Sequence, residues 1–337
     1  MNTKKIAVVL INVGTPDSPD RKSVKKYLKQ FLNDPEVIDI PAFFRYILVN
    51  FIIIPFRTGK STKLYKKLWS KEGSPLLVYT EKLLEKLNQQ QDGSTNFYYA
   101  MRYGNPTIRD VFAEIEKGSY DEIVVFPMFP QYASSTTGTV IKYCKKLAKE
   151  LNLPDKIKYI EQFYNHPLFV EAFVTRVKDY KPDKYDHIVF SFHGLPLRHI
   201  RKSHPGIHPE NCNCASELPE HGHYCYKATC YETARLIVEK AGLKKENYSV
   251  AFQSRLSRNW LKPFTDEVLT HLAMGGNSSV LVIAPSFVTD CLETIVEIDD
   301  EYNKLFKANG GGRLTLVDSL NATDLWVSAV RHIVNNP

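Results

Sequence analysis

Two short segments of the sequence carry side chains that accept protons or hold metals. His193 follows the apolar stretch 187–192, and Asp290, Glu293 and Glu297 are spaced three and four residues apart. On a helix, this spacing places the three carboxylates on one face. Crowded carboxylates give up protons reluctantly and bind hard cations, and an imidazole is a base or a metal ligand. Together they predict a proton-removing base beside a path for a divalent metal such as iron.

Simpler explanations compete for both segments. An isolated histidine is more often structural than catalytic, and a run of acids usually forms a solvated helix face. The position of both segments directly after apolar strands favours function, because parallel sheets bind ligands beyond the carboxyl ends of their strands. A hydrolase triad is poorly supported, since no nucleophile and third partner accompany His193 in the sequence.

A second cluster consists of Cys212, Cys214, Cys225 and Cys230, which lie within 19 residues. Disulfides are disfavoured in a reduced cytoplasm. Four thiolates hold either a tetrahedral zinc ion or an iron–sulfur cluster. The paired Cys-x-x-Cys spacing usual for zinc is missing, and a nearby histidine, His221 or His223, can replace one thiolate. The spacing alone leaves both metal centres open.

Apolar runs that alternate with helical stretches position these groups. Eight runs predict strands: Ile6–Ile11, Phe97–Met101, Ile123–Pro127, Lys158–Glu161, Ile188–Phe192, Tyr248–Phe252, Val280–Ala284 and Leu314–Val317. The alternation is typical of an α/β protein with parallel sheets, and 337 residues suit two domains. We predict two similar Rossmann-like domains, each a four-stranded parallel sheet flanked by helices, over residues 1–165 and 166–337. The second carries a cysteine-rich insertion at about 203–230, and the carboxyl strand ends of both line a cleft between them.

Charge and motifs exclude several other classes. No Gly-x-Gly-x-x-Gly follows the first strand and no Gly-x-x-x-x-Gly-Lys-Ser/Thr occurs, which disfavours dinucleotide and P-loop enzymes. The net charge of +7 suits an anionic small molecule or a membrane surface, and we expect no nucleic acid partner. The first apolar run lacks a small-residue cleavage site, so we expect a strand there and a cytoplasmic protein.

The segment Phe43–Phe56 interrupts the alternation of strand and helix patterns. Its 14 residues are mostly apolar, interrupted by Arg45 and Asn50, and a bilayer span needs about 20. It is either a buried helix or an exposed apolar lip that receives a flat hydrophobic ligand or rests on a membrane. Basic residues follow directly and favour a lip over about residues 41–75: Arg57, Lys60, Lys63, Lys66, Lys67 and Lys71. Such an edge suits an amphiphile with an apolar body and carboxylate tails.

Six short sequence motifs, taken in order, resemble those of one enzyme family. They are Leu10–Pro16, Met101–Pro106, Pro130–Gly138, Ser191–Pro196, Phe252–Arg255 and Ser286–Thr294. With them the chain resembles the bacterial ferrochelatases over nearly its whole length. The resemblance implies a chelatase-like fold and a lyase that inserts ferrous iron into protoporphyrin IX, giving protohaem in the last step of haem synthesis.

The resemblance also implies roles for individual residues. His193 matches the family's active-site histidine, which accepts pyrrole protons or binds the incoming iron, and Glu293 matches the acid facing it. Asp290 and Glu297 match an acidic row that relays protons or metal. Six further positions match residues that contact the porphyrin: Val13, Arg57, Ser74, Arg102, Tyr103 and Tyr132.

The chain departs from the family in three places. Phe252 replaces a tryptophan, and Cys291 stands where many relatives have histidine, which puts the role of that position in doubt. The cysteines of the animal enzymes are absent. Several bacterial ferrochelatases carry a [2Fe-2S] cluster on an internal insertion, so the resemblance favours that cluster over zinc on Cys212, Cys214, Cys225 and Cys230.

Two other functions compete with iron insertion. A cobalt or nickel chelatase of a related tetrapyrrole shares the fold and the histidine, but tends to have a second histidine where Glu293 stands. A porphyrin or haem carrier needs apolar walls and an axial ligand, but has no use for three acids in a row.

Overall fold

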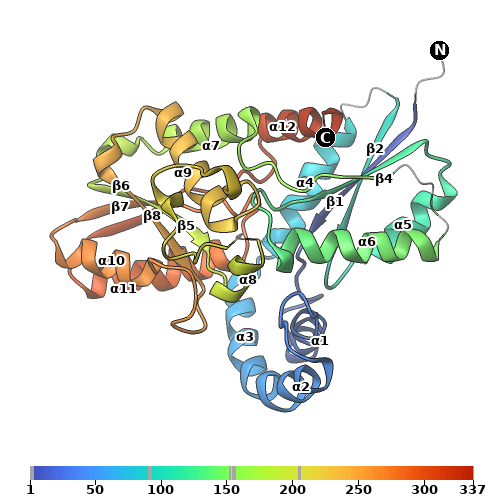
Figure 1. Cartoon of the computed structure of the whole chain (residues 1–337), viewed down its shortest axis with the longest axis horizontal. Coiled ribbons are helices and arrows are strands. Elements are labelled where there is room, and N and C mark those ends of the chain that lie inside the picture. The colour runs from blue at the N-terminus through green and yellow to red at the C-terminus, as the bar shows by residue number, and fades with distance from the viewer. Residues whose placement is uncertain (1–3, 90–92, 152, 154–156, 204–205, 337) are drawn as a thin grey trace. The chain divides into compact units, whose positions relative to one another are not determined.

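The computed structural model describes residues 4–89, 93–151, 153, 157–203 and 206–336. The two strand sets form two four-stranded parallel sheets, with the strand orders β2-β1-β3-β4 and β6-β5-β7-β8 (Figure 1). The chain groups into two compact units. Unit 1 comprises residues 1–129, 133–162 and 330–337, and unit 2 comprises residues 130–132 and 163–329. The predicted fold class is confirmed.

Unit 1 contains β1 (Ile6–Asn12), β2 (Thr95–Met101), β3 (Glu122–Pro127) and β4 (Ile157–Tyr159). Every residue from Ala7 to Ile11 is buried, as the continuous apolar run of a central parallel strand requires. On one face, the amphipathic helices α5 (Ile108–Lys117) and α6 (Thr139–Glu150) complete the core. The helix α4 (Pro75–Gln89) packs beside β2.

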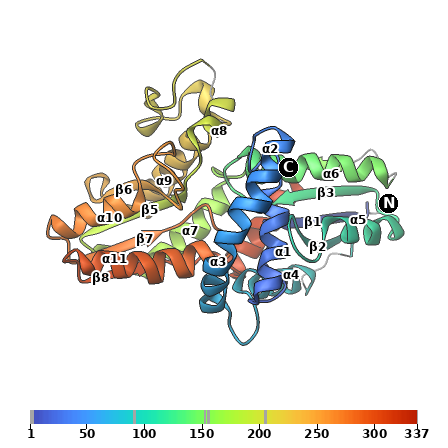
Figure 2. The same cartoon turned by 90° about the horizontal axis from the view of Figure 1, so that it is seen from below.

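Unit 2 repeats this plan with β5 (His187–His193), β6 (Tyr248–Gln253), β7 (Ser279–Ile283) and β8 (Arg313–Leu316). Figure 1 shows α7 (Pro167–Asp179) and α9 (Tyr226–Ala241) on one side of the sheet, and α10 (Thr265–Met274) and α11 (Asn303–Ala308) on the other. Figure 2 again shows α10 and α11 together. All eight predicted strands therefore exist, with ends shifted by one or two residues.

The segment after β7 is a π-helix, η7 (Leu292–Tyr302), which leads into α11. The acidic spacing predicted a helix here, and the structure confirms one from Leu292 onward. Its π character was not predicted, because a spacing of four residues fits the wider turn as well as the α-helical turn. Such turns are rare and often occur at functional sites.

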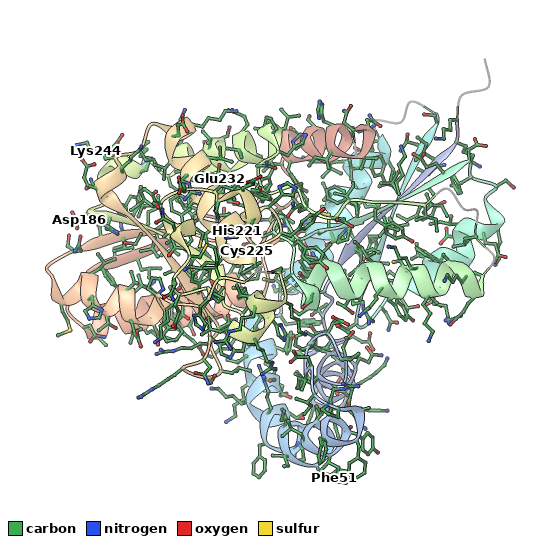
Figure 3. The ribbon with its side chains drawn as sticks, in the orientation of Figure 1. Phe51, Asp186, His221, Cys225, Glu232 and Lys244 are labelled. Carbon is green, nitrogen blue, oxygen red and sulfur yellow. The ribbon has the colours of Figure 1, made fainter. Side chains whose placement is uncertain are left out.

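The lip segment of unit 1 forms α2 (Ala42–Ile47), the π-helix η1 (Leu48–Ile53) and α3 (Ile54–Leu68), which run on as one helix of 27 residues. α3 packs against α1 (Arg21–Leu32). Figure 1 shows α1, α2 and α3 as a helical projection from the first sheet, and Figure 3 places Phe51 at its tip. By length and composition this helix is long enough to cross a membrane, unlike the 14-residue apolar run alone. One such helix is weak support for a span, because its second half carries four lysines and buries Ser61, Thr62 and Tyr65.

The remaining elements are short, apart from the last helix. They are η2 (Ser134–Gly138), η3 (Pro182–Lys184), α8 (Leu197–Lys202), η4 (Asn213–Ala215), η5 (Glu220–Gly222), η6 (Lys245–Asn247) and α12 (Asp324–Asn335). The predicted insertion at 203–230 follows α8 and ends in the first turns of α9; its residues 204 and 205 lie outside the described residues.

Candidate active site

His193 is the last residue of β5, in register with Gln253 at the end of β6. Its carbonyl oxygen accepts a hydrogen bond from Tyr226 Oη at 2.8 Å, which fixes the strand end. The half-buried ring lies between Trp260 and Phe287, with ring centroids 6.4 and 6.3 Å away. Aromatic walls with an unblocked imidazole suit a base facing a flat apolar ligand.

Gln253 joins the histidine strand to the acidic helix. It is 1% exposed and accepts a hydrogen bond from Ser191 Oγ at 2.8 Å. Its Nε2 donates to the carbonyl oxygen of Glu293 and to Glu297 Oε2, each at 3.0 Å. The sequence identified Gln253 only as one of several polar residues at a strand end. Its linking role depends on contacts about 40 residues away along the chain.

Glu293 lies in the first turn of η7 and is half-buried. The thiol of Cys291, two residues earlier, is hydrogen-bonded with this carboxylate, and burial together with the Glu293 charge raises the pKa of Cys291 well above its usual value. The backbone N–H of Cys291 donates to Thr294 Oγ1 at 2.9 Å, which caps the helix. A neutral thiol therefore stands beside Glu293 at the position where histidine was expected in relatives.

Glu297 is held by four hydrogen bonds. Its Oε1 accepts from the backbone N–H of Ser254 and from Tyr302 Oη, both at 2.8 Å. Its Oε2 accepts from Gln253 Nε2 at 3.0 Å and from Ser254 Oγ at 2.5 Å. Ser254 adopts a φ of +62°, a conformation unusual for a side-chain-bearing residue, and this brings its N–H toward the carboxylate. Glu297 thus anchors η7 to the end of β6.

Asp290 precedes η7, so the expectation that three carboxylates share one helix face is wrong for this residue. It is buried and accepts hydrogen bonds from Asn321 Nδ2 at 2.7 Å, Thr294 Oγ1 at 3.1 Å and the N–H of Ser319 at 3.2 Å. These donors fix the loop between β7 and η7. Only Glu293 of the acidic row has a carboxylate that is not fully engaged by such donors.

In unit 1, the predicted porphyrin contacts Arg102 and Tyr103 converge on Asp34, which the sequence did not single out. Asp34 Oδ2 accepts from Arg102 at 2.5 Å, Tyr103 Oη at 2.9 Å and Thr139 Oγ1 at 2.7 Å. The Arg102 guanidinium also lies 4.7 and 4.5 Å from the ring centroids of Tyr103 and Tyr143. Burial and the Asp34 charge raise the pKa of Tyr103, which is 3% exposed.

Val13 lies in the loop after β1, and Ser74, directly before α4, contacts this loop through Thr15. The carbonyl oxygen of Val13 accepts from the N–H of Tyr103 at 3.0 Å. Gly14 follows with a φ of +106°, and a Cβ there would stand 1.7 Å from the Tyr103 carbonyl oxygen, so only glycine fits. Ser74 is 1% exposed, with its Oγ 3.0 Å from Thr15 Oγ1. Arg57 lies on α3 of the lip.

Tyr132 belongs to unit 2, where its ring lies 5.7 Å from that of Tyr224 in the cysteine-rich insertion. The adjacent Gln131 donates to Thr233 Oγ1 of α9 at 3.0 Å and accepts from Ser286 Oγ at 3.3 Å. These contacts tie the loop at 130–132 to α9 and to the end of β7.

The four cysteines of the insertion are buried and form no disulfide. Burial, together with Cys212 and Cys225, raises the pKa of Cys214 to about 12, against the opposing effect of Lys227. Cys212 Sγ lies 3.4 Å from His221 Nε2. The thiols are therefore close enough to influence one another. Even so, no three His, Cys, Asp or Glu side chains among the described residues stand in a metal-ligand arrangement.

Hydrogen bonds to backbone carbonyls hold the insertion against α9. Arg235 donates to the carbonyl oxygens of Cys214 at 3.3 Å and Ala215 at 3.2 Å. Lys227 Nζ donates to the carbonyl oxygen of Pro209 at 2.9 Å. Cys225 occupies the residue before the first turn of α9, and Cys230 lies in its second turn. Helix and loop together thus bring the thiols into one buried region.

Comparison with known proteins connects this arrangement to one family. The family model described as Ferrochelatase matches residues 5–337. A ferrochelatase of Coxiella burnetii is 40% identical over 98% of this chain and 93% of its own length. A ferrochelatase of Legionella pneumophila is 38% identical over 97% of this chain and 98% of its own.

Two solved structures share the fold. The sirohydrochlorin chelatase SirB from Bacillus subtilis subspecies spizizenii, in complex with cobalt, superposes with a TM-score of 0.54 and 14% identity, covering 99% of this chain and 97% of that one. SirB from Bacillus subtilis with Fe³⁺ gives a TM-score of 0.55 and 13% identity, covering 98% and 96%. At this identity the likeness concerns the fold alone.

Proposed function

The chain belongs to the ferrochelatase family, and from that premise we propose how its own residues carry out the reaction. The protein is a lyase that inserts ferrous iron into protoporphyrin IX to form protohaem. For each ring metallated, one Fe²⁺ enters and two pyrrole N–H protons leave. The residues must therefore bind a flat apolar dianion, remove two protons and admit a cation.

We assign proton removal to His193 and Glu293. The observation that carries this assignment is Gln253, which lies beside His193 in the sheet and donates to the backbone of Glu293. The imidazole accepts a pyrrole proton, and the Glu293 carboxylate accepts the second or guides the incoming iron. Both groups are half-buried, and the imidazole lies near the rings of Trp260 and Phe287, where a base is less solvated and its interactions are stronger.

The other two acids are proposed to support this pair. Asp290 and Glu297 were predicted to relay protons or metal, and their carboxylates accept three and four hydrogen bonds. An ionised carboxylate has about four acceptor sites, and these hydrogen bonds occupy most or all of them. We therefore propose that Asp290 and Glu297 act by holding η7 in place. Any relay of protons or metal ions would then run over the protein surface outside Glu293.

Porphyrin binding is proposed for the six predicted residues in two ways. Val13, Arg57 and Tyr132 are half-buried and are proposed to touch the ring or its propionates. Ser74 and Tyr103 are buried and bonded to other residues of unit 1, and Arg102 is paired with Asp34. These three are proposed to shape the loops that hold the ring.

The reaction is tested with purified full-length protein, protoporphyrin IX and ferrous iron without oxygen, followed by absorption spectroscopy. Conversion to haem over many turnovers is expected. A spectral shift that stops at one equivalent would instead identify a porphyrin carrier. Faster insertion of cobalt or nickel into a sirohydrochlorin-type ring would identify the competing chelatase.

A [2Fe-2S] cluster on Cys212, Cys214, Cys225 and Cys230 is a separate proposal. Four buried thiols outside disulfides are the donor type that such a cluster or a zinc ion takes, and binding would draw them from their present positions into a ligand arrangement. The bound group would tie the insertion to α9, and no step of iron insertion is assigned to it.

The cluster is tested by iron, zinc and acid-labile sulfide analysis of anaerobically purified protein. We expect two iron and two sulfide per chain, lost in Cys225→Ser and retained in Cys144→Ser, which changes a buried cysteine of α6. Absence of sulfide refutes the cluster, and one equivalent of zinc identifies the alternative.

A cytoplasmic protein that touches the membrane through the lip is the last part of the proposal. Seven apolar side chains of the lip are exposed: Phe43, Phe44, Tyr46, Ile47, Phe51, Ile52 and Phe56. Of these, Phe56 is 83% exposed and Phe43 is 69% exposed. Contiguous exposed aromatic side chains of this kind mark a surface that meets a ligand, a partner or a bilayer. Both substrate delivery and membrane contact would use the same edge.

A further inference from the structure

The positive charge of the chain is concentrated in the helical projection. Residues 21–71 hold twelve Lys and Arg against three Asp and Glu, a balance of +9. The whole chain has a balance of +7, so the other residues together carry −2. The apolar lip is thus part of the only strongly basic stretch of this length in the sequence.

Two of the three acids in this stretch are neutralised by residues outside it. Asp34 is paired with Arg102, and Glu36 is paired with Lys142 of α6. Neither acid is therefore available to offset the lysines of α1 and α3. The projection keeps most of its formal positive charge at the surface.

Four lysines near the lip form a collar: Lys25 and Lys29 on α1, and Lys60 and Lys63 on α3. All four are exposed, and none pairs with an acidic side chain among the described residues. Lys60 and Lys63 lie four and seven residues after the exposed Phe56, so they share its face of α3. Lys25 and Lys29 likewise share a face of α1, one helical turn apart.

We propose that the collar binds the headgroups of an anionic bilayer while the exposed aromatic tip enters its surface. This rests on the proposed membrane contact of the lip and names the lipid chemistry that it recognises. The occupant follows from charge complementarity, since an apolar tip alone would meet a neutral bilayer equally well. The collar instead selects a negatively charged one.

The physical reason is that either signal alone gives weak attachment. A single apolar anchor binds a bilayer marginally, and stable attachment usually needs a second signal such as a basic patch. Each lysine near an anionic surface strengthens partition by about fivefold. If two of the four lysines reach headgroups at a time, removal of all four weakens partition by about thirtyfold. The effect fades with salt because the Debye length is about 8 Å at physiological ionic strength.

The test is co-flotation of the full chain with phosphatidylcholine vesicles, with and without phosphatidylglycerol. Three variants are compared with the wild type. The collar variant replaces Lys25, Lys29, Lys60 and Lys63 by Gln. Its matched control replaces four exposed lysines of unit 2 by Gln, namely Lys178, Lys184, Lys244 and Lys245, and so changes the net charge equally. The tip variant replaces Phe51 and Phe56 by Ser.

We expect the wild type and the matched control to float with phosphatidylglycerol vesicles in a salt-sensitive manner, and the collar variant to bind them about thirtyfold more weakly. Iron insertion with detergent-dispersed porphyrin is measured for the collar variant beside flotation, because Lys60 and Lys63 lie in the segment proposed to receive the porphyrin. Its melting temperature verifies folding, and Lys60→Gln with Lys63→Gln serves as a milder variant.

Collar-variant binding equal to wild type would overturn the proposal, and loss of binding in the tip variant would then leave the lip contact standing. Equal loss in the matched control would show an effect of net charge alone and would also overturn it. A wild type that floats with neither vesicle would refute both membrane proposals. Iron insertion is measured separately, so the ferrochelatase activity does not depend on either result.

Discussion

The two sheets have the same strand order but use their carboxyl ends differently. At the end of the first sheet, Arg102 and Tyr103 are paired with Asp34 and are largely buried. At the end of the second, Gln253, Ser254 and Tyr302 saturate Glu297. There the ring of His193 is half-buried without such a partner among the described residues, and the half-buried Glu293 carboxylate is hydrogen-bonded with the thiol of Cys291.

Under the proposed assignment of His193 and Glu293, this difference separates a scaffold from a reaction site. A buried charge is costly unless it is paired, so a strand end whose charged groups are all paired is stable but chemically idle. A strand end whose neighbouring polar side chains are fully hydrogen-bonded to one another can keep one base and one carboxylate available. The shared topology therefore places polar side chains at the same end of each sheet. Their hydrogen-bond and ion-pair partners decide whether these side chains are available to react.

The largest expected effect comes from removing the base of the second sheet. His193→Ala should lower the rate of iron insertion by about 10³-fold, since positioned general bases contribute about 10²–10⁴-fold. The protein should remain folded and should still bind protoporphyrin, because the ring of His193 is not hydrogen-bonded to any described residue. The rate of haem formation and porphyrin fluorescence quenching measure the two properties. Near-normal turnover would remove His193 from the mechanism.

Glu293→Gln should slow insertion by about a hundredfold, because an amide of the same shape accepts no proton. Its stability should stay close to that of the wild type, since the structural contact of Glu293 with Gln253 uses the backbone carbonyl oxygen. Single-turnover haem formation and thermal melting are the measurements.

Glu297→Gln is the matched control one helical turn away. An amide would place N–H groups against donors, so stability should fall by about 2 kcal/mol while turnover falls less than in Glu293→Gln. If the two variants lose equal turnover with unchanged stability, the distinction between an anchoring and a reacting acid fails.

In the first sheet, Asp34→Asn should act on stability rather than on chemistry. It leaves Arg102 without its carboxylate partner, and breaking a largely buried pair costs about 3 kcal/mol. Denaturant unfolding measures the loss, and kcat for the folded fraction should remain within a few-fold of wild type. Unchanged stability with a large loss of kcat would place a reacting group at the first sheet also.

The smallest effect is expected at the other end of β5. Burial lowers the pKa of His187 below its ordinary value of 6.5. Below pH 6.5 the unfolded chain binds a proton at His187 that the folded chain does not readily take up. The contribution of neutral His187 to the free energy of unfolding is therefore full above pH 6.5 and is lost as the pH falls further. His187→Gln should therefore lose less stability than the wild type between about pH 7.5 and about pH 5.5. Parallel pH profiles of melting temperature would contradict this.

The sequence by itself determined the strands and their grouping. The run Ala7–Ile11 and its counterpart Ile188–Phe192 are apolar at nearly every position, a pattern typical of parallel strands buried on both faces. The exposure of the lip was one of two alternatives that the sequence left open, and the structure decided it. Hydrophobic pattern is local information, so it can be read without knowing what packs against it.

Only the tertiary structure decided which polar groups form hydrogen bonds and ion pairs with one another. The pair of Arg102 and Asp34 joins residues 68 apart, and the bonds of Gln253 and Ser254 to Glu297 join residues 44 and 43 apart. The position of Asp290 before η7 is likewise fixed by hydrogen bonds from Asn321 and Ser319. A carboxylate looks the same in a sequence whether it is saturated or available, because hydrogen-bond partners are chosen by proximity in space and not by spacing along the chain.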